Sequence, residues 1–489
     1  MRIILTLTLL SVSAHAGDGN RLAYLDTNDS YYVSRKFPTL ITPQWIGEKG
    51  VDAVVILAID DMRGYQKWEN YLRPILKRLK RIDGRAPVSI MTCRLNPNEK
   101  HLQKWIEEGV SLEVHTFDHP CPILQGGSLA KAKATYDRCV DLLASVPNMH
   151  PVAFRTPCCD SMNTPSPRMF AEIFNKVTPK GNFLTVDSSV FCTLTPNDPE
   201  LPRKVVFDEG KDRFAKYLPK DRSFVNTIED YPYPYVLGQL CWEFPCLTPS
   251  DWQAQHLHKP NNAITVRDWK AALDGVVVKK GVFNFVFHPH GWIKNSQMIE
   301  FIDHAVTKHG KKVKFLNFRE AYDRICKHLL GRQTLRDEKG NDNGVRLIDV
   351  NNDGYLDVVI GNAKVKKTRI WQPKTQSWKE TSFPVDLRTA GARFGVVHKD
   401  GRPSLVLHTP EISTGWTFSK DTWIKDDNLI PNLPEKAQTL FADKKGRDRG
   451  ARLRDVDGDG ICELILGDVG IYKWSERGWG LMPVALPKG

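Results

Sequence analysis

The sequence contains no apolar run long enough to cross a membrane. The longest candidate lies within residues 1–16 (MRIILTLTLLSVSAHA), and it is shorter than the about 20 apolar residues that a spanning helix needs. This segment has one basic residue, an apolar stretch and the small-residue site Ala14-His15-Ala16, which are typical of a signal peptide. We therefore expect residues 1–16 to be removed, no membrane span, and a mature chain that is secreted or periplasmic.

The chain also lacks a C-x-x-C pair and a concentrated basic segment. Its ten cysteines permit disulfides in an exported protein, but without C-x-x-C they do not indicate a zinc ribbon or a c-type haem. The net charge of +12 would suit an anionic polymer. The basic residues are dispersed, however, and runs such as 77–81 and 308–314 are typical of solvated helix faces and loops. We therefore expect no nucleic-acid partner.

Up to residue 330, short apolar runs alternate with amphipathic stretches. The 489 residues, 41% of them hydrophobic, suffice for two or three domains with buried cores. The predicted strands are 51–60, 86–93, 111–117, 151–157, 182–189, 282–288 and 313–318. The predicted helices are 99–108, 129–145, 167–176, 267–279 and 296–309. Alternation of strand and helix predicts an α/β fold of parallel strands with covering helices, and about seven such units favour a closed (β/α) barrel over an open sheet.

Several of the predicted strands end in polar residues. These residues are Asp60 and Asp61, His115, Arg155, Asp187 and His288. In a barrel, such strand ends lie together on the C-terminal face, where active sites are built. For Asp187 we expect only a structural hydrogen bond in the barrel rim, and we interpret the others as candidate site residues.

The segment VHTFDHPCP (114–122) places two histidines, His115 and His119, four residues apart. Together with Asp61 they supply two imidazoles and a carboxylate, a common set for a hydrolytic zinc-type site that leaves a position open for water. Such a metal lowers the pKa of bound water toward ~7 and polarises a carbonyl oxygen. Asp60 is the candidate that takes the proton of the water. Adjacent residues of an extended strand point to opposite sides, so the two aspartates share a site only if the strand ends there.

Two further residues complete the predicted chemistry. Arg155 is the candidate that orients Asp60 and keeps it ionised, and His288 is the candidate general acid for the leaving group. His290 competes with His288 for this role. We favour His288 because it ends the predicted strand directly.

Five segments resemble, in order, the motifs of the polysaccharide deacetylase family, also called the NodB-homology family. They are ILAIDD (56–61), HTFDH (115–119), RTP (155–157), VDSS (186–189) and VFHPH (286–290). The resemblance covers roughly residues 50–330. It implies a distorted (β/α) barrel that removes acyl groups from amide- or ester-linked sugars with zinc or a similar divalent metal. It assigns the metal ligands to Asp61, His115 and His119, and the roles of base, partner of the base and acid to Asp60, Arg155 and His288.

The sequence departs from the family pattern in two places. Cys158 and Cys159 stand where a glycine usually follows the Arg-x-Pro motif. The long aromatic segment 190–266 contains no family motif, and we expect it to shape the substrate cleft. Because Cys121 and the Cys158-Cys159 pair follow neighbouring strands, a disulfide at the rim is compatible with the sequence, but its connectivity cannot be deduced.

After residue 331 the sequence repeats. The stretches GVRLIDVNNDGYLDVVIGN (344–362) and GARLRDVDGDGICELILGD (450–468) share one pattern, and GARFGVVHKDGRPSLVLHT (391–409) is a third copy that has lost most of its acidic residues. The spacings are 391 − 344 = 47 and 450 − 391 = 59 residues. Such periods, each followed by tryptophans, are typical of propeller blades or a related β array. Three repeats do not close a usual propeller, which has 4–8 blades.

The repeat loops follow the pattern D-x-[DN]-x-D-G-x-x-[DE], which places hard oxygens around a glycine-containing turn and suits Ca²⁺. The predicted calcium ligands are Asp349, Asn351, Asp353 and Asp357 in one copy, and Asp455, Asp457, Asp459 and Glu463 in the other. An EF-hand would need Glu at the twelfth position, which is Ile360 or Leu466. Strand-like runs follow both loops, so the copies resemble FG-GAP or VCBS propeller repeats. We expect no metal in the middle copy.

The sequence thus predicts three parts: a signal peptide at 1–16, a polysaccharide deacetylase-like barrel at 17–330 and a β-repeat module at 331–489. The leading hypothesis is a secreted metal-dependent deacetylase that hydrolyses N-acetyl or O-acetyl groups on a glycan, with protein or glycan contacts through the repeats. One alternative is a hydrolase of non-sugar C–N bonds on the same barrel. The other is a non-catalytic glycan-binding or adhesive protein. The complete metal set with a base favours an enzyme.

Overall fold

The structure is a computed structural model, and its described residues are 19–25, 33–124, 126–159, 166–218, 227–433, 437, 441–442, 447–467 and 469–483. The predicted signal peptide lies outside these residues. The described chain divides into two compact units. The larger unit comprises Tyr24–Ile348 and Gly354–Arg388, and the smaller unit comprises the described parts of Met1–Ala23, Asp349–Asp353 and Thr389–Gly489.

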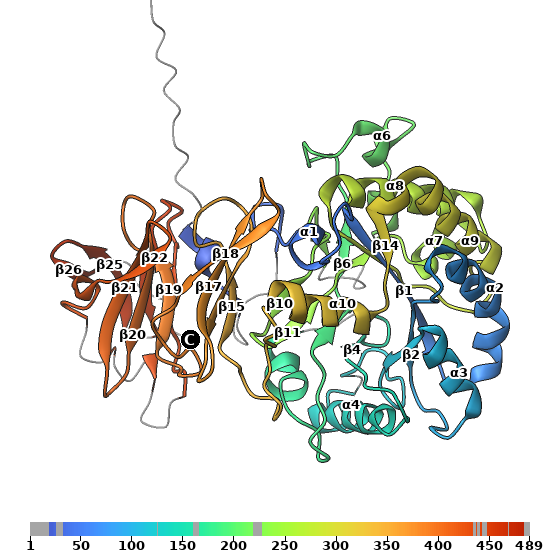
Figure 1. The fold of residues 1–489 in the computed structure, drawn as a ribbon, viewed down its shortest axis with the longest axis horizontal. Coiled ribbons are helices and arrows are strands. Elements are labelled where there is room, and N and C mark those ends of the chain that lie inside the picture. Colours follow the sequence, from blue (N-terminus) through green and yellow to red (C-terminus); the bar gives the residue numbers. More distant parts are fainter. Residues whose placement is uncertain are drawn as a thin grey trace, which may run out of the picture. The chain divides into compact units, whose positions relative to one another are not determined.

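A curled sheet of mainly parallel strands forms the centre of the larger unit (Figure 1). Each of the seven predicted strands corresponds to one of its members. The strands are β1 (Ala53–Met62), β2 (Val88–Thr92), β3 (Ser111–Val114), β4 (Ala153–Phe154), β5 (Val186–Asp187), β6 (Phe191–Thr193), β9 (Ile228–Glu229), β10 (Tyr235–Leu237), β11 (Cys241–Glu243), β12 (Cys246–Leu247), β13 (Val282–Asn284) and β14 (Val313–Phe315). A separate two-stranded ribbon consists of β7 (Phe207–Asp208) and β8 (Lys211–Asp212).

The strand pairings lead round the curled sheet and back to β1. Strands β1 to β5 pair successively in parallel. Residues 186–193 contain β5 and β6, and residues 241–247 contain β11 and β12. These two segments run side by side, because β5 pairs with β11 and β6 pairs with β12. β12 then pairs with β13, and β13 pairs with β1. The sequence predicts no strand at 241–247, which lies in the aromatic segment that carries no family motif.

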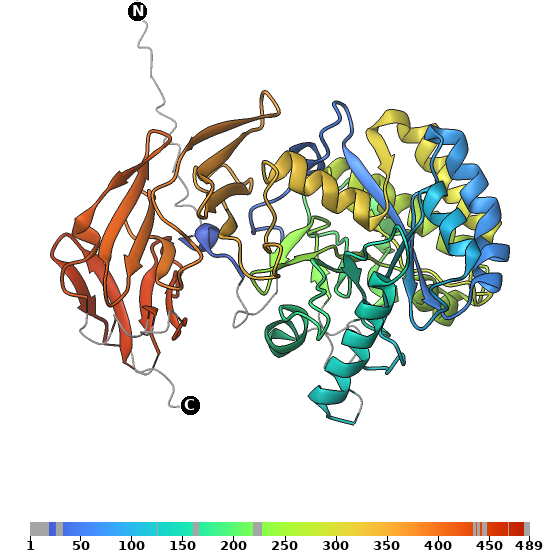
Figure 2. The same ribbon diagram turned by 60° about the horizontal axis from the view of Figure 1, so that its bottom comes forward.

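Helices cover the outside of the curled sheet (Figures 1 and 2). They are α1 (Thr42–Trp45), α2 (Tyr65–Asp83), α3 (Lys100–Glu108), α4 (Leu129–Ala144), α5 (Pro167–Met169), α6 (Arg203–Val206), α7 (Asp251–His258), α8 (Ala263–Lys279), α9 (Asn295–His304) and α10 (Phe318–Arg324). Turns of π-helix continue α5, α9 and α10 as η2 (Phe170–Phe174), η4 (Ala305–His309) and η6 (Ile325–Leu329). Side-chain caps begin several helices, as where Ser128 accepts a hydrogen bond from the Lys131 amide at the start of α4. No helix in the described part of the chain combines the length and apolar character that crossing a bilayer requires.

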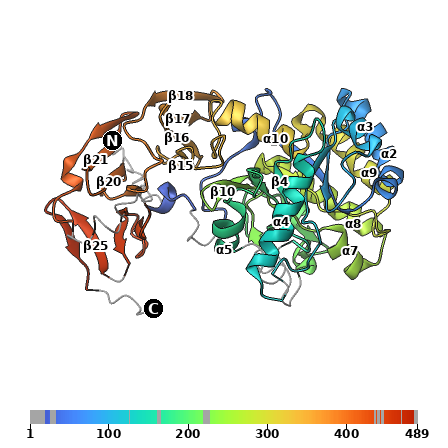
Figure 3. The same cartoon turned by 90° about the horizontal axis from the view of Figure 1, so that it is seen from below.

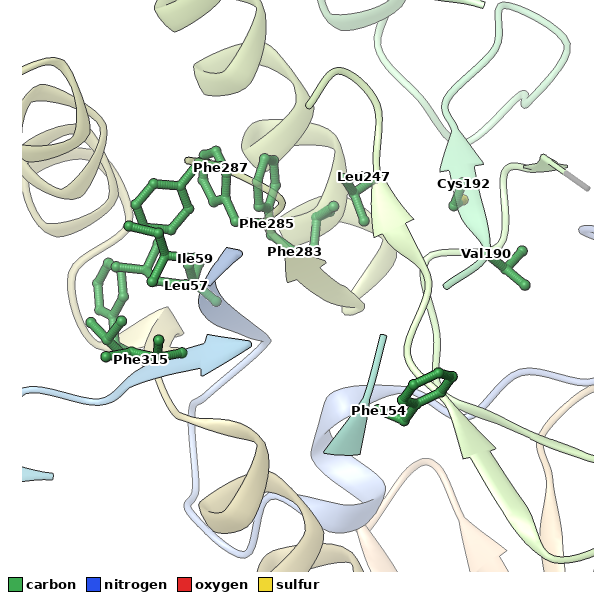
Figure 4. Close-up of a cluster of buried hydrophobic side chains, with 14 of the residues drawn as sticks. Leu57, Ile59, Phe154, Val190, Cys192, Leu247, Phe283, Phe285, Phe287 and Phe315 are labelled. Carbon is green, nitrogen blue, oxygen red and sulfur yellow. The ribbon is translucent and has the colours of Figure 1, made fainter. Parts of the chain in front are cut away.

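Alternating apolar side chains fix the strand ends that carry the candidate site. Phe283, Phe285 and Phe287 recur at every second position, and their neighbouring rings lie 4.7 and 6.0 Å apart (Figure 4). Leu57 and Ile59 of β1 belong to the same buried cluster. Each such side chain contributes about 1.5–3 kcal/mol by leaving water. The buried side chains of Ile59 and Phe287 therefore fix the backbone positions of the residues that follow them, Asp60 and His288.

The first sequence repeat forms a four-stranded antiparallel sheet within the larger unit. Its strands are β15 (Val345–Ile348), β16 (Asp357–Gly361), β17 (Lys366–Gln372) and β18 (Ser377–Ser382) (Figure 3). Val345, Val358 and Ile360 share a buried apolar cluster with Trp45 and Phe318. The change of sequence pattern at residue 331 and the division into compact units therefore fall at different places.

The other two repeats form two more four-stranded antiparallel sheets in the smaller unit. The strands are β19 (Ala392–Val396), β20 (Pro403–His408), β21 (Ser413–Ser419), β22 (Thr422–Lys425), β23 (Ala451–Arg454), β24 (Glu463–Leu466), β25 (Gly470–Ser475) and β26 (Gly478–Leu481). Val406, Leu453 and Trp479 belong to their common apolar core. Each predicted repeat thus corresponds to one sheet, while the propeller arrangement stays a prediction.

Candidate active site

A β-bulge at the end of β1 directs two adjacent carboxylates into one site. Ile59 pairs with Ile90 and Met62 pairs with Thr92, so β1 has one more residue than β2 over this interval. Asp61 adopts a left-handed backbone conformation with φ of 73°. Asp60 and Asp61 were expected to share a site only if the strand ended there. The strand continues to Met62, and the bulge removes the strict alternation of side chains.

Asp61 lies against both histidines of the segment 114–122. Its Oδ1 is 2.7 Å from His119 Nε2 and 3.3 Å from His115 Nε2. The ligand atoms of the three side chains all lie within 4.8 Å of one another. Burial raises the pKa of Asp61, but hydrogen bonds from His115, His119 and His290 outweigh that effect and lower it far below its usual range. The three predicted metal ligands therefore converge, with the carboxylate ionised.

The second ring nitrogen of His115 is fixed by the backbone. His115 Nδ1 lies 2.8 Å from the carbonyl oxygen of Arg155, which can only accept, so Nδ1 carries the proton. With Nδ1 occupied in this way, Nε2 is the ring nitrogen that faces Asp61 and that a metal ion could take as a ligand. A carbonyl that holds the outer nitrogen of a histidine is a usual feature of metal sites. The donor set fits a zinc-type ion.

Asp60 is held by a buried arginine. Arg155 Nη1 donates to Asp60 Oδ1 at 2.7 Å, and both side chains are almost entirely removed from solvent. The rest of the guanidinium is also occupied, because Nε donates to the carbonyl of Ser188 and Nη2 donates to the Ser188 hydroxyl. Arg155 therefore has a single orientation and fixes the position of the Asp60 carboxylate.

His288 forms a dyad with a buried aspartate. Its Nδ1 lies 2.8 Å from Asp251 Oδ1, and its backbone N–H donates to Asp251 Oδ2 at 2.8 Å. Burial lowers the pKa of His288, but the charges of Asp251, Asp60 and Asp61 outweigh burial and raise it to about 9. His288 Nε2 lies 3.9 Å from Asp61 Oδ2, so the protonated ring reaches the candidate site.

His290 approaches the same oxygen of Asp61 as His288, and the two rings are stacked. Lys67 Nζ donates to His290 Nδ1 at 2.8 Å, because an ammonium group has no acceptor. The remaining proton of His290 is then on Nε2, which donates to Asp61 Oδ2 at 2.8 Å. His290 is therefore committed to Asp61, while the His288 ring faces the cavity.

A cavity of about 450 Å³ brings these groups together. Asp60, Asp61, His115, His119 and His288 line it. The remaining lining residues are Cys121, Pro122, Cys158, Cys159, Phe191, Ser250, Trp252, Val286 and Trp292. The site is thus a polar cluster with apolar and aromatic walls, as is usual for a cavity that binds a small group.

The rim of the cavity contains a disulfide between Cys121 and Cys158, whose Cα atoms are 5.8 Å apart. The sequence left the choice between Cys158 and Cys159 open. Cys159 is a buried free thiol. Asp187, for which only a structural role was expected, is buried and accepts a hydrogen bond from the Ser189 hydroxyl at 2.8 Å.

Two elements of the site were missed in the sequence. Asp251 and Trp252 begin α7 within the segment 190–266, and Ser250 caps that helix. The signal in the sequence was the stretch Ser250-Asp251-Trp252, a helix cap next to an acidic residue, but its pairing with His288 spans 37 residues. Trp292 follows the predicted strand at 282–288 closely, and nothing in its local pattern indicated that it lines the cavity.

The acidic loop of the third repeat is organised around a lysine. The ligand atoms of Asp455, Asp457 and Glu463 lie within 4.8 Å of one another. Lys473 Nζ of the neighbouring strand β25 lies 3.1 Å from Asp457, 2.5 Å from Asp459 and 3.2 Å from Glu463. An internal cation therefore already contacts three of the four predicted calcium ligands.

The acidic loop of the first repeat is divided between the two compact units. Asp349, Asn351 and Asp353 belong to the smaller unit, and Asp357 belongs to the larger one. The Asp353 amide donates to Asp349 Oδ1 at 3.2 Å, and Asn351 Nδ2 donates to Asp353 Oδ2 at 2.9 Å. Asp357 is buried and accepts a hydrogen bond from the Trp371 amide.

Comparison with protein families supports a polysaccharide deacetylase domain in the first part of the larger unit. Residues 47–166, less than half of the chain, match the family model described as polysaccharide deacetylase. This stretch contains Asp60 and Asp61 of β1, His115 and His119 after β3, and Arg155 directly after β4. A comparison with curated proteins gives no match.

Several solved structures are similar in part. The Puue allantoinase shares 12% identity at a TM-score of 0.36, covering 58% of this chain and 93% of the other. A polysaccharide deacetylase from Bacillus cereus shares 14% identity at a TM-score of 0.31, with coverages of 54% and 91%. A peptidoglycan deacetylase from Bacillus subtilis shares 15% identity at a TM-score of 0.29, with coverages of 57% and 97%.

Proposed function

We propose that the protein is a secreted, metal-dependent carbohydrate deacetylase that hydrolyses N-acetyl or O-acetyl groups of a glycan. The observation that carries the proposal is the divergence of two adjacent carboxylates at one strand end. Asp61 faces His115 and His119, whereas Asp60 faces Arg155, and both aspartates line one cavity. The family match over residues 47–166 supports the same reaction class.

The donor set of Asp61, His115 and His119 fits zinc or a similar divalent ion. A bound ion of this kind lowers the pKa of a water molecule toward ~7 and polarises the acetyl carbonyl. The protein keeps the ligands in place through the outer contacts already described. The Arg155 carbonyl holds His115, and His290 holds the second oxygen of Asp61.

Asp60 takes the proton of the attacking water in this proposal. The contact with Arg155 orients the Asp60 carboxylate, so that its other oxygen accepts the proton. His288, held by Asp251, gives a proton to the leaving nitrogen or oxygen of the sugar. The water oxygen bonds to the carbonyl carbon, the bond to the sugar breaks, and acetate and a free amine or hydroxyl result.

The walls of the cavity suit a small acyl group next to a sugar ring. Phe191 and Val286 supply apolar surface, while Trp252 and Trp292 supply aromatic faces, that of Trp292 beside His288. Aromatic faces commonly contact the apolar side of a ligand, while a few polar groups fix its orientation. The rim disulfide between Cys121 and Cys158 holds one edge of this cavity.

The experiment that tests the proposal is a measurement of acetate release. Acetylated chitin fragments, peptidoglycan fragments and acetyl-xylan are offered side by side to the zinc-loaded full chain. Acetate release that stops after chelation and returns with zinc is expected for at least one of them. Release of ammonia or an amine from non-sugar amides alone would favour the C–N hydrolase, and glycan binding without any release would favour the adhesive protein.

The acidic repeat loops are proposed calcium sites, and the repeats are proposed to contact glycan or protein. The alternating oxygens of the loops support the first proposal. A hollow in the smaller unit, lined among others by Lys399, Arg477 and Trp474, supports the second. The hollow is also lined by Asp400 and Glu476, and an aromatic face among charged groups of both signs suits a polar partner.

A further inference from the structure

A second group of metal-ligating side chains lies outside the cavity, on the covering helices of the larger unit. Asp274 of α8, His304 at the end of α9 and His309 at the end of η4 place their ligand atoms within 4.8 Å of one another. All three side chains are partly exposed, so an ion can reach them from solvent.

The two imidazoles meet at a single carboxylate oxygen. His304 Nε2 lies 3.0 Å and His309 Nε2 lies 2.8 Å from Asp274 Oδ1. Asp61 in the candidate active site has the same arrangement, with two histidine Nε2 atoms on its Oδ1 at 2.7 and 3.3 Å. The two clusters therefore offer the same donor atoms in a similar geometry.

The turn of π-helix in η4 builds this arrangement. Residues five apart in an α-helix lie about 140° apart around the axis, because each residue turns the chain by about 100°. An α-helical continuation of α9 would thus have turned His309 away from His304. The i→i+5 pattern of η4 places them on one side instead, with ring centroids 5.9 Å apart. Both rings then face Asp274 on the neighbouring helix α8.

We propose that Asp274, His304 and His309 form a second binding site for a divalent transition metal of the zinc class. A tetrahedral ion with ligands at 2.0–2.1 Å separates those ligands by about 3.3 Å. The present separations of 2.8 and 3.0 Å need to open by only about 0.3–0.5 Å. Two imidazoles and one carboxylate favour such ions over Ca²⁺ or Mg²⁺, which take oxygen ligands. Solvent supplies the remaining ligand.

The site links two helices rather than lining a substrate cavity. Asp274 lies within α8, and the histidines lie at the end of α9 and in η4. Since the ligands come together only in the folded chain, the ion stabilises that state by mass action. Lys308 Nζ, which lies 2.6 Å from Asp274 Oδ2, balances the charge of the carboxylate when no ion is bound. Its side chain is half exposed and can swing into solvent.

The test counts zinc on the full chain. The protein is stripped with a chelator, reloaded with Zn²⁺, freed of unbound ion and analysed for zinc per chain. The unaltered chain is expected to hold two ions, His309→Ala one, His119→Ala one, and the double variant none. Loss of the ion in His309→Ala with acetate release retained separates this site from the proposed active site.

Controls exclude an indirect effect of the substitution. His101→Ala removes another surface histidine that pairs with a carboxylate, Glu99, and it should retain two ions. Lys308→Ala removes a competing cation but no ligand, and it should bind the second ion at least as tightly. The second equivalent of Zn²⁺ should raise the melting temperature of the unaltered chain and not that of His309→Ala or His304→Ala. If both of these variants keep two ions, or if the unaltered chain holds only the ion that His119→Ala removes, the second site does not exist.

Discussion

Arg155 and Asp60 form an ion pair of 2.7 Å that is almost completely sealed from solvent, whereas the carboxylate of the next residue, Asp61, lies against the rings of His119 and His290. The β-bulge at the end of β1 separates the two environments. One carboxylate is thus held in position by a fixed cation, and the other is held among imidazole rings.

The asparagine variants of the two aspartates should fail in different ways. Asp61→Asn weakens a charged ligand, so it should lose metal affinity and regain part of its rate with excess zinc. Asp60→Asn keeps the metal but accepts no proton, so its turnover should fall by about 10²–10⁴ without rescue. Zinc titration followed by rate measurement distinguishes them. Rescue of Asp60→Asn by zinc, or loss of metal from that variant, would reverse the two roles.

Alanine variants of His288 and His290 should also differ in their effects on turnover and metal affinity. His288→Ala should retain metal and lose turnover by about 10²–10⁴, because it removes the proton donor of the leaving group. His290→Ala removes a hydrogen bond to Asp61, so its metal affinity should fall by about 10–100-fold, and saturating zinc should restore most of the rate. Competition of each variant with a zinc chelator measures the affinity. An unrescued loss of turnover in His290→Ala with normal metal binding would make His290 the acid.

Glu113 should make the larger unit less stable as the pH rises. Burial raises its pKa from 4.5 to about 7, although the amides of Val152 and Ala153 donate to its carboxylate. The folded state then keeps a proton that the unfolded state releases above pH 4.5, so stability falls between pH 4.5 and 7 and the loss is complete above 7. The difference between the pKa of Glu113 in the folded and in the unfolded state corresponds to a loss of about 3 kcal/mol in the free energy of unfolding.

Glu113→Gln keeps an acceptor for both amides and removes the titration. Its free energy of unfolding at pH 8 should exceed that of the unaltered chain by up to about 3 kcal/mol, and the two should agree near pH 4.5. Urea unfolding at both pH values gives the comparison. An equal pH dependence in the two proteins would show that Glu113 is ionised in the folded state.

Calcium should act differently on the two acidic loops, because only the third repeat carries Lys473. The pair Trp371–Trp378 in the first repeat corresponds to the pair Trp474–Trp479 in the third. The residue before Trp371 is Ile370, so the first repeat has an isoleucine where the third has Lys473. Ca²⁺ must displace the lysine from the third loop, so that loop should respond weakly in the unaltered chain. Lys473→Met leaves three carboxylates without a cation, so it should lower the melting temperature without calcium and increase the gain on adding it.

The sample for this measurement is the full chain, because the first repeat shares its core with the larger unit. Asp353→Ala and Asp459→Ala together should remove the calcium response. A melting temperature that does not change with calcium in the unaltered chain and in Lys473→Met would rule out calcium binding by the loops.

Local patterns were enough to predict the strand-helix alternation, the repeats and the residues at the strand ends. Strands with a buried face and covering helices leave a periodic trace in a short window, and polar residues directly after such strands mark the face on which a site forms. Asp61, His115 and His119 lie close together in the structure, and their role as metal ligands stays a prediction. The three repeats also appear as three sheets, and the first strand of each begins one residue after the start of its repeat.

Only the tertiary structure decided the features that depend on distant partners. The bulge at Asp61 depends on how β1 pairs with β2, and the dyad of His288 with Asp251 joins residues 37 positions apart. The segment 241–247 is a strand because β5, β6 and β13 are there to pair with it. Lys473 of β25 contacts the acidic loop that precedes β24. The members of these pairs lie too far apart in the chain to be recognised from a short stretch of sequence. The periodicity of a buried face, in contrast, can be seen within each short stretch.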